Sequence, residues 1–265
     1  MPDYRTLEQQ FREILNLKRP PVAVSFLDQP PAGVEKFEGS EPSGCSFWRL
    51  AAQGRAFYTV PSDHYNCPVG SYTHKIELPA DRARELPDIL GTMTNLGYLK
   101  MEEVPDIPVL KETPKFIVYA PLSKTPVDPD VVLLAAVPGK LMLLEEAALR
   151  AGLAAKLPLL ARPTCMAIPA AIGSGMVTSA GCIGNRVYTS INDDEMYSAI
   201  PGAALQPLAD ALQTVMQANT APRPGRVSSG PAQSALDSLD RTDAGLYRLK
   251  SLLSSPSRFS RPTTS

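Results

Sequence analysis

Residues 162–186 read RPTCMAIPAAIGSGMVTSAGCIGNR. Between Arg162 and Arg186 this stretch has no charged side chain, and it carries Cys165 and Cys182, two of the four cysteines in the chain. It is long enough to cross a bilayer, which takes about 20 apolar residues. Its prolines, glycines and hydroxyl side chains would interrupt and hydrate a membrane helix. We therefore expect a buried segment made of a short helix after Pro163, a turn at 173–175, a strand over 176–180 and a sharp loop at 181–184.

Helical and strand patterns on either side of this stretch predict an α/β fold. Apolar residues at helical spacing indicate a helix over 4–17, and a further helix near Pro79 with Leu86, Leu90, Met93 and Leu96 spaced for burial. Strands are expected at 22–26, 57–60, 115–120 and 130–136, and the continuous apolar character of the last two indicates burial on both faces. A strand, a Pro-Gly turn and a helix occur in that order twice, over 130–151 and 196–216. These patterns predict a mixed sheet with helices packed on it.

The composition changes at about Asn219. Residues 219–265 are rich in Ser, Pro, Arg and Thr and poor in large apolar side chains, so they have little apolar surface to bury. We predict a single α/β domain over 1–218 that carries the four cysteines, followed by a disordered C-terminal tail over 219–265.

Charge and composition exclude some classes of partner. The formal net charge is −1. This argues against nucleic acid as a ligand, because proteins that bind nucleic acid usually present a basic face to it. The N-terminal residues are polar and lack the apolar core that a signal peptide would have, and no lipidation signal is evident. We expect a cytoplasmic protein, in which cysteines are reduced, metal-bound or catalytic rather than paired in disulfides.

The cysteines have similar local surroundings. Cys45, Cys67, Cys165 and Cys182 each lie in or beside a turn, where free backbone N–H groups can stabilise a thiolate. Paired Cys-x-x-Cys knuckles, which are typical of structural zinc sites, are absent from the sequence. Four single cysteines that converge after folding suit a buried cluster better than a zinc ribbon. Buried cysteines without a ligand role, and a single nucleophilic cysteine, are the alternatives.

Other polar residues are candidates to complete a site. Asn185 and Arg186 follow Cys182 closely, and Arg186 is a candidate to bind a carboxylate or phosphate of a cofactor, or to pair with the acidic run 193–195. His64 is a candidate ligand or proton carrier, and we expect His74 at the surface. Lys140 lies near a predicted helix start that could hold an anion. Neither a Walker loop nor a Rossmann glycine fingerprint is present in the sequence.

Five motifs together resemble a known family. They are Gly-Cys-Ser-Phe-Trp at 44–48, His-x-x-Cys-x-x-Gly at 64–70, Pro-Thr-Cys-x-x-Ile-Pro at 163–169, Ser-x-Gly-Cys-x-Gly-Asn-Arg-x-Tyr at 179–188 and Asp-Asp-Glu-Met-Tyr-x-Ala-Ile-Pro-Gly at 193–202. In this order they resemble the bacterial and archaeal family called domain of unknown function 169, over about Leu7 to Met216. The resemblance implies that the four cysteine motifs belong to the shared pattern of the family. It implies no activity.

Three functions remain open at this stage. The first is a metal or iron–sulfur protein with Cys45, Cys67, Cys165 and Cys182 as ligands. Zinc is the alternative metal. Such a protein would act on a redox partner or a small molecule. The second is a thiol enzyme with Cys45 as nucleophile and His64 as base, because a helix start after Ser43 would lower the thiol pKa. The third is a non-enzymatic binder or sensor in which Arg186 anchors an acidic small molecule.

Overall fold

The computed structural model describes residues 2–153, 157–160 and 162–220. Within these residues seven strands form one sheet in the order β2-β3-β1-β4-β7-β6-β5. The strands are β1 (Val22–Leu27), β2 (Phe57–Thr59), β3 (Phe116–Pro121), β4 (Val131–Ala136), β5 (Leu159–Leu160), β6 (Val177–Ser179) and β7 (Met196–Pro201). Adjacent strands are antiparallel except for β5 and β6, which are parallel. The sheet is thus mixed, as predicted.

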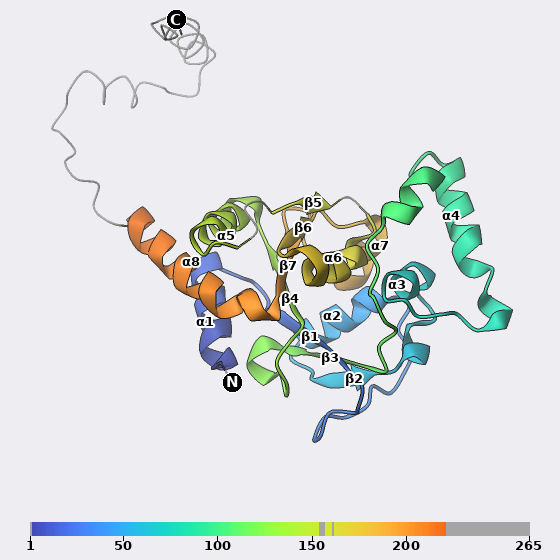
Figure 1. Ribbon diagram of the computed structural model, residues 1–265, viewed down its shortest axis with the longest axis horizontal. Helices are drawn as coiled ribbons and strands as arrows, with labels where there is room; N and C mark the ends of the chain where they lie inside the picture. Colours follow the sequence, from blue (N-terminus) through green and yellow to red (C-terminus); the bar gives the residue numbers. More distant parts are fainter. Residues whose placement is uncertain (1, 154–156, 161, 221–265) are drawn as a thin grey trace, which may run out of the picture. The chain divides into compact units, whose positions relative to one another are not determined.

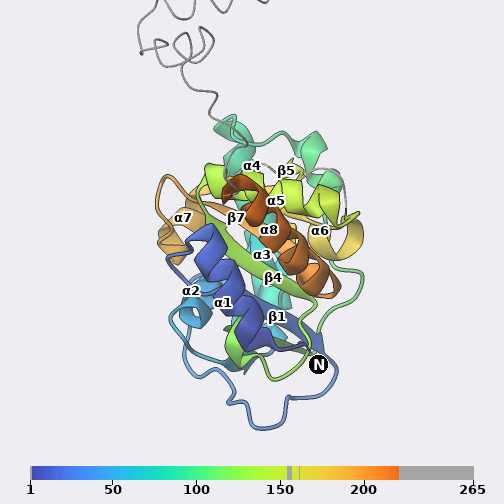
Figure 2. The ribbon, with the colours of Figure 1, turned by 90° about the vertical axis from the view of Figure 1, so that its left-hand side faces the viewer.

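Helices cover both faces of this sheet (Figure 1). They are α1 (Tyr4–Leu15), α2 (Gly44–Ala52), α3 (Pro68–Thr73), α4 (Glu85–Asn95), α5 (Pro138–Arg150), α6 (Ala167–Ser174), α7 (Ile183–Thr189) and α8 (Leu205–Thr220). Figure 2 shows α1, α5 and α8 together in front of β1 and β4. Their buried side chains form one core, and those of α2 and α6 belong to a second core on the other face.

The central strands supply both cores because successive side chains point to opposite faces. In β4, Val131 and Leu133 belong to the core with α2 and α6, whereas Val132 and Leu134 belong to the core with α1, α5 and α8. All four side chains are buried. The predicted burial of this strand on both faces is confirmed.

Three predicted elements differ from the structure. Helix α4 begins at Glu85, with Pro87 in its first turn, where proline is tolerated. None of its side chains is buried, and Leu96, predicted to be buried, is 74% exposed. The loop expected at 181–184 is instead the start of a helix, because Cys182 caps α7. Helix α8 runs to Thr220, past the predicted boundary at 218, and the rest of the predicted tail lies outside the described residues.

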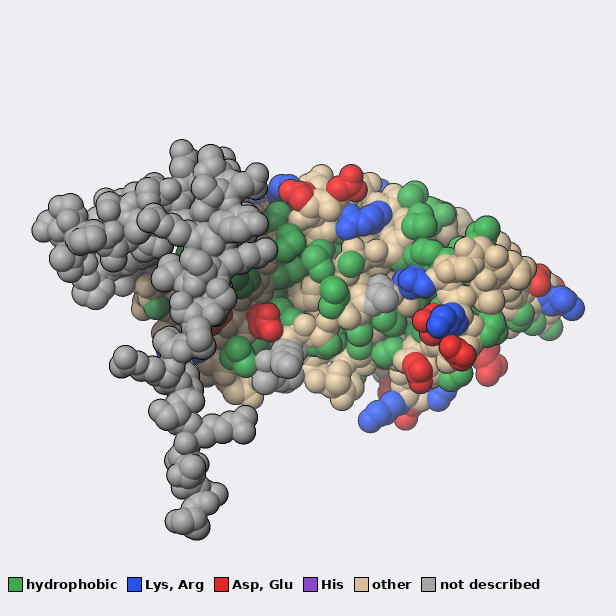
Figure 3. Space-filling view, turned by 90° about the horizontal axis from the view of Figure 1, so that it is seen from above, with side chains coloured by type: hydrophobic (Ala, Val, Ile, Leu, Met, Phe, Trp, Pro, Cys, Tyr) green, Lys and Arg blue, Asp and Glu red, His purple; other side chains and the backbone are tan. Residues whose placement is uncertain are grey.

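The uncharged stretch after Arg162 is a broken, buried segment, as predicted. It forms a short turn, then α6 and β6, and Gly175 between them has φ +103°, which favours glycine. No helix among the described residues is long and apolar enough to span a bilayer. Figure 3 shows hydrophobic side chains in small scattered groups on one face, with acidic and basic side chains near one another.

The two histidines form a buried pair. His64 is 2% and His74 is 4% exposed, and their rings stack with centroids 6.0 Å apart. The surface position expected for His74 is therefore wrong. Thr59 Oγ1 lies 2.8 Å from His64 Nε2, and His74 Nδ1 donates to the Gly70 carbonyl at 2.9 Å. Burial lowers the pKa of His64 to about 3, with repulsion from His74 as a second cause, and lowers the pKa of His74 to about 4.

Two Pro-Gly turns that look alike in the sequence differ in packing. The Gly202 N–H donates to the Asp130 carbonyl at 2.9 Å, and a Cβ at this position would lie 1.6 Å from the Pro129 carbonyl oxygen. A Cβ at Gly139 would meet no atom within 4 Å. Only the turn after β7 requires glycine, because only there does another segment of backbone touch it.

We therefore expect Gly202→Ala to lower the free energy of unfolding by about 3 kcal/mol or more. The matched variant Gly139→Ala should be neutral or stabilise by up to about 1 kcal/mol, since alanine favours a helical first turn. Urea denaturation of the two variants and the wild type measures both effects. Equal stability of the two variants would contradict the close approach of Pro129 to Gly202.

The histidine pair predicts a loss of stability in mild acid. Both folded-state pKa values lie below the usual 6.5, so the unfolded chain binds more protons between about pH 4 and 6.5. As the pH falls through this window, each histidine should remove about 1 kcal/mol of stability per pH unit. His74→Phe should make the free energy of unfolding depend less on pH. Denaturation of variant and wild type at pH 6.5 and at pH 5 measures this difference. The same slope in variant and wild type would show that His74 is charged or exposed when folded.

Candidate functional site

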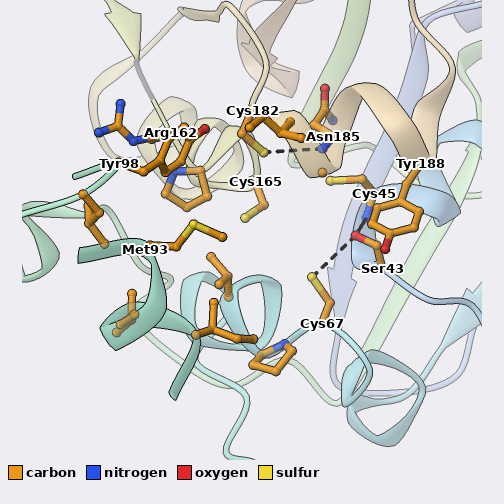
Figure 4. A pocket seen from close by; sticks show the side chains of 18 of the residues that line it. Ser43, Cys45, Cys67, Met93, Tyr98, Arg162, Cys165, Cys182, Asn185 and Tyr188 are labelled. Carbon is orange, nitrogen blue, oxygen red and sulfur yellow. Dashed lines mark hydrogen bonds between the residues drawn. The ribbon is translucent and has the colours of Figure 1, made fainter. Parts of the chain in front are cut away.

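Four cysteines from four separate segments line one cavity of about 430 Å³. Cys45 is the second residue of α2, Cys67 is the N-cap of α3 and Cys182 is the N-cap of α7. Cys165 lies in the turn that leads into α6. Figure 4 shows the four sulfur atoms around the same space. The structure thus brings together the four residues that the sequence identified as candidate metal ligands.

Backbone geometry holds the sulfurs of Cys182 and Cys67 in place. The Asn185 backbone N–H donates to Cys182 Sγ at 3.4 Å, and the Cys182 N–H donates to Thr164 Oγ1 at 2.6 Å. Gly181, with φ +83°, provides the turn that precedes Cys182. A Cβ at Gly70 would lie 2.8 Å from Cys67 Sγ, so α3 can approach this sulfur only because residue 70 is glycine.

Ser43 links the other two segments of the site. Its side chain accepts a hydrogen bond from the Cys45 N–H at 3.4 Å and lies 3.5 Å from Cys67 Sγ. It is the N-cap of α2, one of the two caps, Ser43 or Ser46, that the sequence allows. One hydroxyl group therefore fixes the start of α2 and contacts a candidate ligand on α3.

Burial makes the inner thiols hard to ionise. Cys45 is 5% and Cys165 is 7% exposed. Desolvation raises the pKa of both thiols, and the charges that neighbouring thiols would carry raise it further. The low pKa expected for Cys45 at a helix start is therefore wrong, because desolvation outweighs the free N–H groups there. A bound cation would remove this cost by offsetting the thiolate charges.

The four thiols are too dispersed to hold one metal ion as they stand. Among the described residues, no group of three or more His, Cys, Asp or Glu side chains could hold one metal ion. Zinc would need its sulfur ligands at about 2.3 Å from one centre. An iron–sulfur cluster binds each cysteine through a different iron atom, so its ligands lie farther apart around a larger group. All four cysteines are free thiols, and the described residues lining the cavity include no His, Asp or Glu.

Asn185 and Arg186, the two candidate cofactor-binding residues, have different surroundings. Asn185 lines the cavity and is 1% exposed, and its amide oxygen and nitrogen have no hydrogen-bond partner of normal geometry. Its amide lies close enough to Cys45 to lower the pKa of that thiol slightly, against the larger effect of burial. Asn185 thus has unused hydrogen-bonding capacity beside a candidate ligand.

Arg186 is held by contacts within the protein. Its guanidinium donates to the carbonyl groups of Asn192, Ala180 and Glu195 at 3.0, 2.8 and 3.3 Å. It also lies 3.8 Å from the Asp193 carboxylate, so the alternative of an ion pair with the acidic run is confirmed. This arginine holds the loop after α7 and is not among the residues that line the cavity.

The remaining sequence candidates lie outside the cavity. His64 does not line it, and its Nε2 is taken by Thr59. Lys140 donates to the Ile14 carbonyl at 3.3 Å rather than facing an anion. The acidic Glu195 is buried and accepts from Arg19 at 3.0 Å. These residues stabilise the fold.

Sequence reasoning missed one wall of the cavity. In the sequence Arg162 marks only the end of an uncharged stretch, yet it lines the cavity, with its guanidinium 4.1 Å from the ring centre of Tyr98. Ile89, Leu90 and Met93 of α4 line the same wall. The available signal was an arginine directly before a long uncharged stretch that contains two candidate ligands.

Comparison with known proteins identifies the family. No curated protein and no solved structure matches the chain. The family model for domain of unknown function 169, described as uncharacterised ArCR, matches residues 10–211, which include all four cysteines. The match covers most of the chain and confirms the resemblance carried by the cysteine motifs. The chain belongs to the domain of unknown function 169 family.

Proposed function

We propose that this protein binds an iron–sulfur cluster through Cys45, Cys67, Cys165 and Cys182 and serves a redox or cofactor-linked role. The observation that carries the proposal is the arrangement of four free thiols, from four segments, around one cavity. Such thiols stay reduced in the cytoplasm, which is the location that we propose. When bound, the cluster would supply one-electron redox chemistry.

The surrounding residues have roles that suit this proposal. The N–H of Asn185 points at Cys182 Sγ, and hydrogen bonds to ligand sulfurs tune the potential of a cluster. The apolar walls exclude water from Cys45 and Cys165, which also shifts the potential of a buried centre. The unpaired amide of Asn185 is a further donor beside Cys45.

A Cys/His thiol enzyme is supported less well. Its nucleophile, Cys45, is buried with a raised pKa, and its base, His64, has a lowered pKa and contacts Thr59. A nucleophilic thiol needs a lowered pKa and a base within hydrogen-bond reach. Zinc is the alternative metal, and it would require the four side chains to move toward one centre.

We expect protein purified without oxygen to contain iron and acid-labile sulfide in equal amounts, with a broad visible absorption band. Cys182→Ser should abolish the colour while the chain still folds, because serine is a poor cluster ligand of nearly the same volume. Without the cluster this change should cost about 1 kcal/mol, whereas loss of a bound cluster should lower stability much further. Iron and sulfide analysis and thermal melting measure these effects.

The matched control is Met166→Leu, next to Cys165 but absent from the cavity lining. It conserves volume, so it should keep the iron and the colour. Full iron content in Cys182→Ser, or no metal in any anaerobic preparation, would rule out the four-cysteine site. Zinc in place of iron would support the alternative metal.

Thiol labelling distinguishes the cluster protein from the thiol enzyme. In metal-free protein at pH 7, the buried thiols of Cys45 and Cys165 should react with iodoacetamide at least about 10-fold more slowly than the partly exposed thiols of Cys67 and Cys182. Mass spectrometry of digested protein gives the rate at each site, and urea-unfolded protein provides the reference. Cluster-loaded protein should be protected at all four positions. Fast labelling of Cys45 alone would instead favour the thiol enzyme.

A further inference from the structure

The cavity extends well beyond the four sulfurs. In Figure 4, Arg162, Tyr98 and Met93 lie on one side of the sulfurs, and Ser43 and Tyr188 lie on the other. The extended wall is apolar and is lined by Ile89, Leu90, Met93, Leu99 and Ile107. The side chains from α4 among them are only half-buried, since they border this space instead of a packed core. The cavity therefore offers an apolar compartment beside the thiols.

Arg162 is the one charged residue among the described residues that line the cavity. It takes part in none of the ion pairs formed by the described part of the chain. Its Nε is buried and lacks a hydrogen-bond partner there, while Tyr98 packs against the guanidinium at 4.1 Å. A partly buried cation without a counter-charge is costly, and an anion at this place would offset that cost.

We propose that the cavity binds a small organic acid with an apolar body. Its carboxylate would pair with Arg162, and its body would lie against Ile89, Leu90 and Met93 of α4. Tyr98 holds the planar guanidinium by stacking, which prepares it for a carboxylate. The inference rests on the proposed function, because the acid would lie beside the cluster held by the thiols.

The charge and shape of the compartment favour a carboxylate over other anions. A single guanidinium matches one carboxylate bidentately, whereas a phosphate dianion would need further donors to leave water. Asn66, another polar side chain of the lining, is already engaged with Ser40, Glu41 and Arg82. The apolar wall gains free energy only from a ligand with an apolar body.

Arg162 thus takes the acid-binding role that the sequence suggested for Arg186. The two arginines border the same uncharged stretch, but three carbonyl groups and Asp193 occupy Arg186. Arg162 retains a free N–H and lines the cavity. Of the two arginines, only Arg162 both lines the cavity and lacks carbonyl and carboxylate partners among the described residues.

Titration calorimetry of anaerobically purified protein with phenylacetate and octanoate tests the proposal. At least one of them should bind saturably, and acetate, without an apolar body, should bind at least about 10-fold more weakly. Phenylacetamide, without the charge, should also bind at least about 10-fold more weakly than phenylacetate. Equal binding of phenylacetate and phenylacetamide, or no binding of either acid to folded protein, would overturn the proposal.

Variants test the assigned residue. Arg162→Gln should weaken binding of the acid at least about 10-fold. Arg162→Lys should weaken it less, because lysine keeps the positive charge but loses the pair of N–H donors that binds a carboxylate bidentately. The matched control Arg84→Gln removes an exposed arginine at the start of α4 that does not line the cavity, and it should bind as the wild type does. Unchanged affinity in both Arg162 variants would overturn the assignment.

The same preparations separate this proposal from the cluster proposal. Acid binding that depends on Arg162 in protein without iron would support the inference while the cluster proposal fails. Iron-loaded wild type that binds neither acid would overturn the inference alone. If Arg162→Gln loses iron and the wild type binds no acid, Arg162 serves as a counter-charge to the cluster, which also overturns the inference.

Discussion

Burial of the central strands on both faces governs the arrangement of the chain. Because β4 alternates its side chains between two cores, a layer of helices must cover each face. Helices α1, α5 and α8 fill one layer and contain none of the cysteines. Helices α2 and α6 cover the other face, and α2 packs against both α3 and α7. Every cysteine motif lies at the start of a helix in this second group.

The same burial that stabilises the fold makes the thiols costly to ionise. Cys45 and Cys165 lie within the core that contains Trp48 and Ile168, so their thiolates would lose hydration and repel one another. Ionisation of Cys45 and Cys165 is therefore costly in the metal-free site. A cationic centre, if bound as proposed, would reverse this balance and couple its binding to stability.

Glycine and hydroxyl groups set the distances within the site. Gly70 leaves room for Cys67 Sγ, Gly181 turns the chain before Cys182, and Ser43 contacts two of the four segments. None of these residues carries charge. Their effect is geometric, because each fixes where a sulfur can lie.

Local patterns in the sequence determined the mixed α/β class, most helix and strand positions, a serine cap at Ser43 or Ser46, and the four cysteines as a candidate set. These depend on periodicity and turn chemistry within about ten residues, which the chain expresses directly. Only the tertiary structure decided the burial of His74, the raised pKa of Cys45, the clash that makes Gly202 necessary, and which of Arg162 and Arg186 lines the cavity. Each of these depends on a segment distant in the sequence, such as Pro129 against Gly202 or Tyr98 against Arg162. Desolvation and close contact are properties of the packed chain, so local sequence patterns do not reveal them.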